Sequence, residues 1–258
     1  MRTDPERRSF LKRSAALAGT LALGGCDRLS ETPWFRQILE SAESATLRAQ
    51  RFLLGSGPLA REYTEADLSP EFRANGSTSI DDFDYQTLAE KGFVDWRLEV
   101  GGLVERPQQL SLAELRAMPA RTQITRHDCV EGWSCIGKWT GVPLAHVLEQ
   151  AGARPRARYV VFRCADALEP GAGVDGQYYE SLGFEDAYHP QTILAYDMNG
   201  HPLPVPHGAP LRLRVERQLG YKMAKYIMRV ELVESLAGIG SGRGGFWEDR
   251  GYEWYAGI

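Results

Sequence analysis

The stretch ITRHDCVEGWSCIGKWTGVPL, residues 124–144, decides how we interpret the rest of the chain. It places Cys129 between His127 and Glu131, with Trp133 close behind. An inert structural thiol is usually buried among apolar side chains, so this polar and aromatic setting makes Cys129 a candidate ligand or nucleophile. The spacing alone names no metal, and a structural cysteine remains the commonest alternative.

Alternating polarity over residues 122–128 predicts a short strand that ends at Cys129, and Gly132, Gly137 and Gly141 predict irregular backbone after it. Further strands are predicted over residues 96–104, 159–164, 192–198, 211–215 and 226–233, and short helices over 111–118 and 143–151. Arg212 and Arg214 alternate with apolar residues, which predicts a charged strand face toward a cleft or solvent. The mixed order of elements predicts an α+β, β-rich fold with mixed sheets and short helices.

The run CVEGWS that begins at Cys129 resembles the molybdenum-binding segment of the sulfite oxidase family of molybdopterin-dependent oxidoreductases, as do Trp139, Gly141 and Pro143 downstream. Within the family it is most similar to the periplasmic methionine sulfoxide reductase branch. The stretch HGAPLRLRVERQLGYKMAKYIMRVEL, residues 207–232, is similar to the second family signature, in which an Arg-bearing strand and a Gly-Tyr-Lys segment hold the pterin phosphate. The two signatures together cover roughly residues 75–235.

The resemblance implies a molybdenum–molybdopterin cofactor (Mo-MPT), with two dithiolene sulfurs and Cys129 as the protein's metal ligand. It also implies catalytic roles for Arg126, which would supply positive charge near the substrate oxygen, and for Trp133, which would form an aromatic wall. The cofactor-binding residues that it implies are Asn75, His127, Cys129, Cys164, His207, Arg212, Gly220, Tyr221 and Lys222.

Several of these assignments have ordinary structural alternatives. Asn75 precedes Gly76 and equally fits a simple turn, and Trp133 equally fits core packing. Cys164 either lies near the cofactor, forms a disulfide with Cys135, or is simply buried. His207 stands where relatives often have Asn.

The implied activity is oxygen-atom transfer at sulfur, with reduction of a sulfoxide, free or in methionine, as the first choice. Oxidation of a small sulfur compound such as sulfite is the alternative within the class, and a non-catalytic tethered binding lipoprotein is the alternative outside it. True sulfite oxidases have an Ala-Gly-Asn run after the ligand cysteine, whereas Glu131 here would repel an anion. The C-terminal dimerisation domain of those enzymes has no counterpart, so we expect a monomer. No C-x-x-C-H haem site occurs, so electrons are expected from a separate carrier such as a membrane haem protein.

Residues 1–25 contain a twin arginine, Arg7-Arg8, followed by a short apolar run, which predicts a twin-arginine signal peptide and periplasmic localisation. The run ends in LGGC, so Cys26 is a candidate lipid acceptor for a membrane anchor, ordinary cleavage being the alternative. We assign residues 26–74 to an N-terminal arm with an amphipathic helix and residues 75–258 to the oxidoreductase domain.

The domain ends in an aromatic tail, FWEDRGYEWY at residues 246–255, which is expected either to wrap the body or to dock an electron-transfer partner. The whole chain carries a net charge of −4, and the first 25 residues hold five basic and two acidic side chains. The remainder is therefore more acidic than the whole, which disfavours nucleic acid as a partner.

Overall fold

The computed structural model describes residues 32–54, 59–169, 171 and 173–258. Contacts divide the chain after Gly55 into two units, which are described separately. The signal peptide expected over residues 1–25 and the candidate lipid acceptor Cys26 lie outside the described residues.

The first unit contains helix α2 (Pro33–Leu54), where the apolar spacing predicts a helix. Pro33 occupies the first helical position, where its missing N–H costs no hydrogen bond. Trp34, Ile38 and Phe52 are exposed large hydrophobic residues on it. Among the described helices, none is long and apolar enough to cross a membrane.

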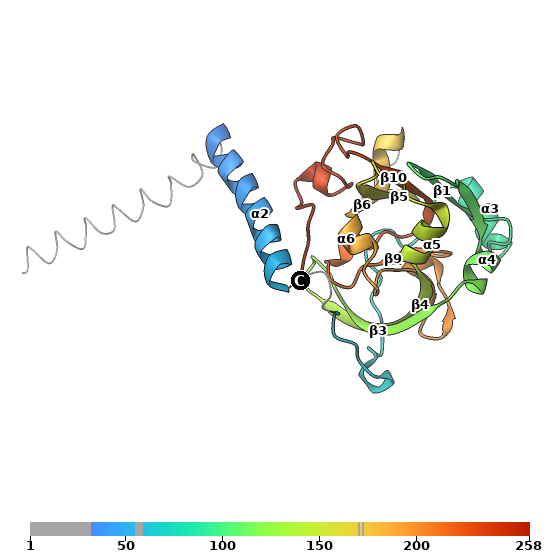
Figure 1. Cartoon of the computed structure of the whole chain (residues 1–258). Coiled ribbons are helices and arrows are strands. Elements are labelled where there is room, and N and C mark those ends of the chain that lie inside the picture. The colour runs from blue at the N-terminus through green and yellow to red at the C-terminus, as the bar shows by residue number, and fades with distance from the viewer. Residues whose placement is uncertain (1–31, 55–58, 170, 172) are drawn as a thin grey trace, which may run out of the picture. The chain divides into compact units, whose positions relative to one another are not determined.

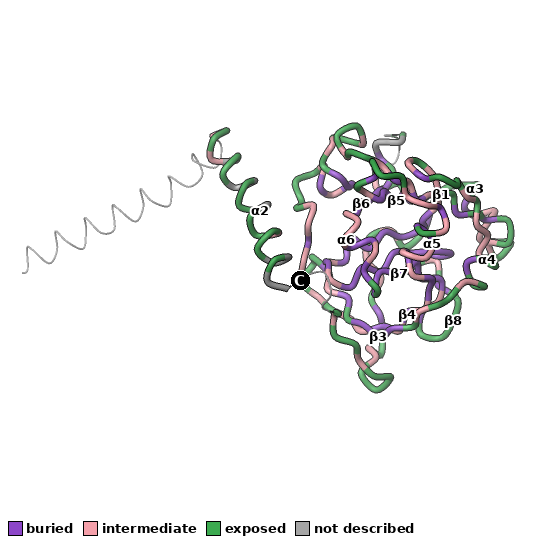
Figure 2. The backbone as a smooth tube through the Cα atoms, in the orientation of Figure 1, coloured by how far each residue is buried: buried purple, intermediate pink, exposed green. Residues whose placement is uncertain are grey.

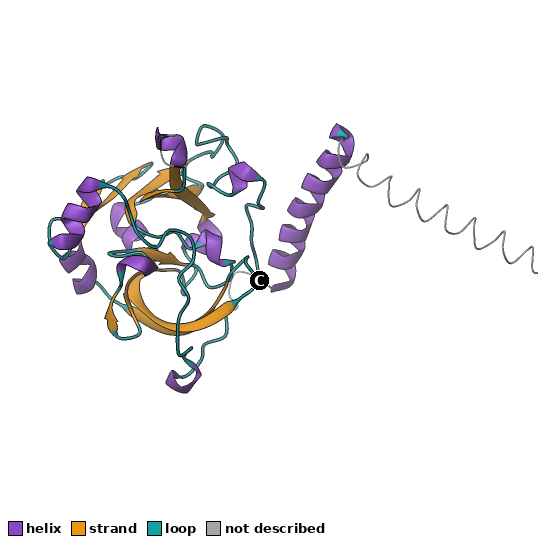
Figure 3. Ribbon diagram, turned by 180° about the vertical axis from the view of Figure 1, so that it is seen from behind, coloured by secondary structure: helices purple, strands orange, loops and turns teal. Residues whose placement is uncertain are grey.

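The second unit consists of two five-stranded sheets (Figures 1 and 3). The first has the order β2 (Gln108–Ser111), β1 (Arg97–Gly102), β10 (Ile227–Val233), β5 (Tyr159–Ala167) and β6 (Gln177–Gly183). Its β1 and β10 pair in parallel, and its other pairs are antiparallel. The second contains β3 (Arg121–Asp128), β4 (Ser134–Pro143), β7 (Ile193–Met198) and β8 (His201–Pro202), with β9 (Arg212–Arg214) also paired to β7. The β-rich α+β expectation is confirmed.

Short helices connect the strands, and local sequence determines where they begin and end. Helix α4 (Leu112–Ala117) begins with the capping box of Ser111 and Glu114. Helix α5 (Leu144–Ala151) ends at Gly152, whose φ of 71° favours glycine. The other helical segments are α3 (Phe83–Glu90), α6 (Phe184–Ala187), η1 (Glu65–Asp67), η2 (Gly173–Gly176), η3 (Val205–His207), η4 (Gly220–Lys222) and η5 (Glu248–Arg250).

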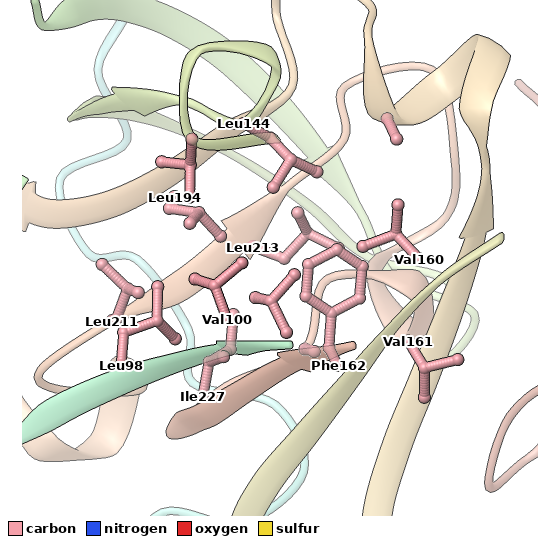
Figure 4. Packing of buried hydrophobic residues seen from close by; sticks show 14 of the residues in the cluster. Leu98, Val100, Leu144, Val160, Val161, Phe162, Leu194, Leu211, Leu213 and Ile227 are labelled. Atoms are coloured by element: carbon pink, nitrogen blue, oxygen red, sulfur yellow. The ribbon is translucent and has the colours of Figure 1, made fainter. Parts of the chain in front are cut away.

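A continuous cluster of buried apolar side chains joins the two sheets. Val100 of β1 and Phe162 of β5 come from the first sheet, and Leu194 of β7 and Leu213 of β9 come from the second (Figure 4). Figure 2 shows buried residues gathered in the interior of this unit and exposed residues along its outer turns. Burial of this shared face fixes the distance between the sheets, and so positions the loops at their ends.

The structure corrects two local predictions. Backbone after Cys129 is irregular only up to residue 133, because β4 runs through both Gly137 and Gly141 as a ten-residue strand. Arg212 and Arg214 lie on no exposed face, since both side chains are completely buried. Phe72, which falls in the segment that we assign to the arm, belongs to the second unit and is buried there in a small cluster with Trp139. Alternation along a strand identifies its two faces but does not tell which face is covered.

Gly141 marks a close approach between strands, which leads to a prediction. A Cβ atom there would lie 2.1 Å from the carbonyl oxygen of Leu194 and 2.6 Å from Cα of Ala195, where the β4–β7 register shifts. Gly141→Ala is therefore expected to lower the free energy of unfolding by about 3 kcal/mol, because backbone must move. Gly238→Ala, where a Cβ meets nothing within 4 Å, is the matched control and should change it by less than about 0.5 kcal/mol. Urea unfolding measures both, and equal effects would contradict the close-approach argument.

Candidate functional site

Cys129 lies in the tight turn of a β-hairpin. Strands β3 and β4 pair up to Asp128 and Ser134, which leaves residues 129–133 as the connection. The backbone N–H of Cys129 donates to the carbonyl of Trp133 at 2.9 Å, and that of Gly132 donates to the carbonyl of Cys129 at 3.0 Å. Gly132 adopts a φ of 85°, which a turn this tight requires. The thiol residue, only 8% exposed, therefore sits at a strand end, as expected from the sequence.

An open-mouthed cavity with about 730 Å³ of empty space, part of it continuous with solvent, adjoins this turn. Its lining comes from five parts of the chain that are distant in sequence: a loop before α3, the hairpin turn, the region around β5 and β6, the η4 loop, and the C-terminal tail. The lining residues are Asn75, Gly76, Ser77, Cys129, Val130, Glu131, Asp166, Leu168, Tyr178, Gly220, Tyr221, Met223, Lys225, Trp247 and Tyr252.

Four of the residues proposed from the sequence line the cavity together: Asn75, Cys129, Gly220 and Tyr221. Gly220 is needed there because a Cβ atom would lie 2.5 Å from the imidazole ring of His127. The η4 backbone thus rests directly on that ring, and the second signature is brought against the first.

His127 lies behind the cavity with its ring completely buried. Its Nδ1 lies 3.0 Å from Nη1 of Arg214 and 3.2 Å from the sulfur of Met223. Burial, and then the positive charges of Arg214 and Arg212, hold the pKa of His127 well below its usual value, so the ring is neutral at pH 7. Because a guanidinium only donates, Nδ1 accepts and the proton resides on Nε2, which has no partner within the protein.

Arg212 is the centre of a cluster of cations beside the cavity. Its guanidinium is completely buried, and it lies over the Trp139 ring at 4.9 Å. Its Nη1 donates to the carbonyl of His207 at 3.0 Å, but Nε and Nη2 have no partner. Burial and the neighbouring Arg214 lower its pKa to about 9, and burial and Arg212 lower the pKa of Lys225 to about 7. Each of these cations lowers the pKa of the next, and Arg212 has free N–H groups. A bound anion would reduce the repulsion between the cations and accept hydrogen bonds from those groups.

His207 and Cys164 lie close to this cluster without lining the cavity. Burial, followed by Arg212 and Lys225, lowers the pKa of His207 to about 4, so it is neutral at pH 7. Cys164 is buried on β5, and burial raises the pKa of its thiol well above the usual value. The disulfide with Cys135 considered from the sequence is not formed, since both residues are free thiols and lie on different sheets.

Three further predicted residues are directed elsewhere. The Nζ of Lys222 is completely buried between the carboxylates of Glu180 and Glu248, so its charge is already neutralised. Arg126 is a half-exposed side chain on β3 that donates to Asp128 at 2.9 Å. The centroid of the Trp133 ring lies 5.6 Å from that of the His127 ring. The Nε1 of Trp133 donates to the Glu131 carboxylate at 2.8 Å, so this side chain stabilises the hairpin turn. These three residues do not line the cavity.

Lys225, which sequence reasoning did not select, lines the cavity, whereas Lys222 does not. Its Nζ donates to the carbonyls of Asn75 at 2.6 Å and of Pro206 at 3.1 Å, and also to that of Ser77. It lines the cavity and holds the Asn75 loop against η4. Both lysines follow Arg212 in the same loop, and nothing in their spacing shows that the 3₁₀ turn of η4 directs Lys222 inward.

Asp166 is a second cavity residue that the sequence did not indicate. Its Oδ2 accepts from the hydroxyl of Ser77 at 2.9 Å, while its buried Oδ1 has no partner. Burial raises the pKa of this carboxyl to about 6. Asp166 therefore titrates close to neutral pH. It is distant in sequence from the Cys129 turn but lines the same cavity.

Comparison with known proteins explains why these residues converge. The model of the oxidoreductase molybdopterin binding domain family matches residues 86–237. The chain is also 39% identical to the putative protein-methionine-sulfoxide reductase subunit YedZ1 of Azospira oryzae, over 98% of this chain and 88% of that protein. This chain belongs to the oxidoreductase molybdopterin binding domain family.

Other relatives match a smaller part of this chain. The protein-methionine-sulfoxide reductase catalytic subunit MsrP of Xanthomonas campestris is 42% identical over 147 residues, 55% of this chain and 46% of that protein. The match thus spans about half the length of that relative. A solved structure, the sulfane dehydrogenase SoxCD of Paracoccus pantotrophus, aligns with a TM-score of 0.49 and 25% identity, over 55% of this chain and 39% of that chain.

The residues present in this oxidoreductase fit a molybdopterin cofactor. The unpartnered N–H groups of Arg212 would hold its phosphate, with Lys225 and the Asn75 loop beside it. Cys129 offers one thiolate, a donor that suits molybdenum, at the end of the cavity formed by the hairpin turn. Among the described residues no group of three or more His, Cys, Asp or Glu side chains could hold a metal ion.

The unpartnered guanidinium predicts opposite effects on stability and on cofactor content. Arg212→Met removes two unsatisfied buried donors, so the cofactor-free protein should gain about 1 kcal/mol of unfolding free energy. Its molybdenum content, measured by elemental analysis after expression in a molybdenum-replete host, should fall below about a tenth of the wild-type value.

Arg214→Met is the matched control on the same strand. Arg214 donates to Glu216 from Nε at 2.9 Å and from Nη2 at 2.5 Å, so its loss leaves a buried carboxylate without its cation. That variant should lose about 3–5 kcal/mol. A cofactor-free Arg212→Met that is less stable than wild type, with full molybdenum content, would show that Arg212 is a structural residue.

The raised pKa of Asp166 predicts a pH-dependent stability in the cofactor-free protein. The folded state binds this proton more tightly than the unfolded chain does, so stability is lost as the pH rises from 3.8 to about 6. Relative to Asp166→Asn, the wild type should lose about 3 kcal/mol between pH 4 and pH 8. Urea unfolding of both proteins across this range measures the difference, and a difference that does not vary with pH would contradict the prediction.

Proposed function

We propose that this molybdopterin oxidoreductase reduces sulfoxides, with methionine sulfoxide as the model substrate. The observation that supports it is the position of the Cys129 thiol at a largely uncharged cavity wall, formed by Val130, Leu168, Tyr178 and Met223. A wall of this kind suits a neutral organosulfur compound. The names of the relatives, a methionine-sulfoxide reductase subunit over nearly the whole chain and a catalytic subunit over half of it, agree with this choice.

The electrostatics of the cavity disfavour sulfite, the alternative substrate. Glu131 lines the cavity beside the thiol, and Asp166 adds a second carboxyl. The cations Arg212 and Lys225 are the groups that we assign to the cofactor phosphate, so they would not be available for a second anion. An anionic substrate would therefore meet net repulsion at the mouth, whereas a sulfoxide would not.

In the proposed reaction a sulfoxide, two electrons and two protons give a sulfide and water. When bound, the cofactor supplies the metal at which the oxygen atom is transferred and electrons are stored. The chain's own part is to hold Cys129 at a fixed position in the hairpin turn, through the Trp133 carbonyl and Gly132. The apolar wall orients the substituents of the substrate and excludes water from one side of the site.

We further propose that electrons arrive from a separate carrier, such as a membrane haem protein, and that the chain acts in the periplasm as a monomer. The twin arginine Arg7-Arg8 supports export after the cofactor is inserted, and Cys26 supports a lipid anchor. The presence of subunit names among the relatives agrees with a multi-component system.

Comparison of two steady-state activities of the loaded protein tests the proposed reaction. With a reduced viologen dye as electron donor for sulfoxide reduction and ferricyanide as electron acceptor for sulfite oxidation, kcat/KM for methionine sulfoxide should exceed kcat/KM for sulfite by at least about 100-fold. Cys129→Ser should lose at least about 1,000-fold in sulfoxide reduction, together with the visible absorption of the loaded wild type. Cys135→Ser, which changes a free thiol that does not line the cavity, is the control and should remain near wild type. Faster sulfite oxidation than sulfoxide reduction would refute the proposal.

A further inference from the structure

The C-terminal tail forms part of the catalytic cavity. Trp247 and Tyr252 line it, although both lie beyond residue 237, where the family match ends. The tail (red in Figure 1) was expected either to wrap the body or to dock a partner. It packs on the body, and two of its aromatic side chains face the space in front of Cys129.

A short turn brings the two rings together. The 3₁₀ helix η5 follows Trp247 and ends at Gly251, whose φ of 102° favours glycine and reverses the chain. The N–H of Tyr252 then donates to the carbonyl of Trp247 at 3.0 Å. The Trp247 and Tyr252 rings stack with centroids 5.3 Å apart at 27°, and Tyr221 meets Tyr252 edge-on at 5.2 Å. The three rings form a continuous aromatic surface.

Buried ion pairs hold this surface in place. Glu248, adjacent to Trp247, is completely buried and accepts from Nζ of Lys222 at 2.5 Å. Lys222 also binds Glu180 of β6, so it ties the tail to the first sheet. On the other side, the Tyr221 hydroxyl donates to the carbonyl of Glu253 at 2.6 Å. An anchor at each end makes the aromatic surface a fixed wall and not a movable flap.

Part of the cavity rim is also apolar and accessible. Val130, next to Cys129, is 47% exposed, and Tyr252 is 38% exposed. Apolar groups of this size at a cavity mouth leave a partly covered surface that a substrate substituent would bury. The aromatic wall and Val130 line the same cavity, so a substituent attached to the reacting sulfur would contact both.

We propose that Trp247 and Tyr252 form the specificity wall of the site and select sulfoxides that carry a flat or apolar substituent over small ones. The inference rests on the proposed sulfoxide reduction and deepens it, because it names the substrate class and the residues that choose it. The wall binds the non-reacting part of the substrate, so it acts mainly on KM.

The test compares two sulfoxides in loaded Trp247→Ala, Tyr252→Ala and wild-type protein. With methyl p-tolyl sulfoxide, KM should rise about tenfold in each variant and kcat should change less than twofold. With dimethyl sulfoxide, which lacks the ring, KM should change less than twofold. Trp247→Phe keeps an aromatic ring and should retain most of the affinity. Phe83→Ala, which removes an exposed aromatic residue outside the cavity, is the control and should behave as wild type.

Equal changes in KM for the two sulfoxides, or no change for either, would overturn the specificity wall. Binding of methyl p-tolyl sulfone, measured by calorimetry, separates this result from failure of the proposed reaction. If wild type reduces neither sulfoxide but Tyr252→Ala weakens sulfone binding about tenfold, the wall stands and the reaction is wrong. If the sulfone binds equally to wild type and variants, the wall is wrong whatever the activity.

Discussion

The strongest electrostatic constraint in the structure is a pair of arginines, both buried on β9. Both guanidiniums lie over the Trp139 ring, Arg212 at 4.9 Å and Arg214 at 4.4 Å, and neither is exposed. Burying a charge is costly unless it is compensated, and Glu216 compensates only Arg214. The charge of Arg212 is left without a carboxylate partner, so an anionic ligand would bind beside it. The second sheet therefore holds the cationic part of the ligand site in its interior.

The charges of these arginines also add to the effect of burial on the protonation of their neighbours. His127 and His207 are neutral at pH 7 because burial and the cations around them lower both pKa values. A neutral imidazole can present one donor and one acceptor, which is the form that stands beside two guanidiniums without further repulsion. Burial and Arg212 also lower the pKa of Lys225 to about 7. Its Nζ donates a hydrogen bond to the carbonyl of Asn75 and so holds that loop. Lys225 therefore connects the cation cluster to the Asn75 loop.

The sequence predicted elements whose signals are local and missed contacts that form only in three dimensions. The capping box at Ser111, the stop at Gly152 and the strand that ends at Cys129 each depend on a few neighbouring residues, and the structure has all three. The family signatures pointed to Cys129, Arg212 and Lys222, but they did not indicate that Lys225, and not Lys222, lines the cavity. That choice depends on Glu180 and Glu248, which lie 42 and 26 residues from Lys222. The contribution of the tail depends on the same long-range pairs.

The contrast between Lys222 and Arg212 explains how the segment from β9 to η4 serves two purposes. Lys222 is saturated by two carboxylates, so it can only tie the tail to the sheet, whereas Arg212 has no carboxylate and retains free donors. Cofactor binding and substrate choice consequently involve different segments: the hairpin turn provides Cys129, β9 provides the arginine assigned to the cofactor phosphate, and the tail provides the aromatic wall. Because the wall is held by its own ion pair, its side chains can differ without disturbing the buried charge on β9. Such separation would let a fixed reaction centre accept a different range of sulfur compounds.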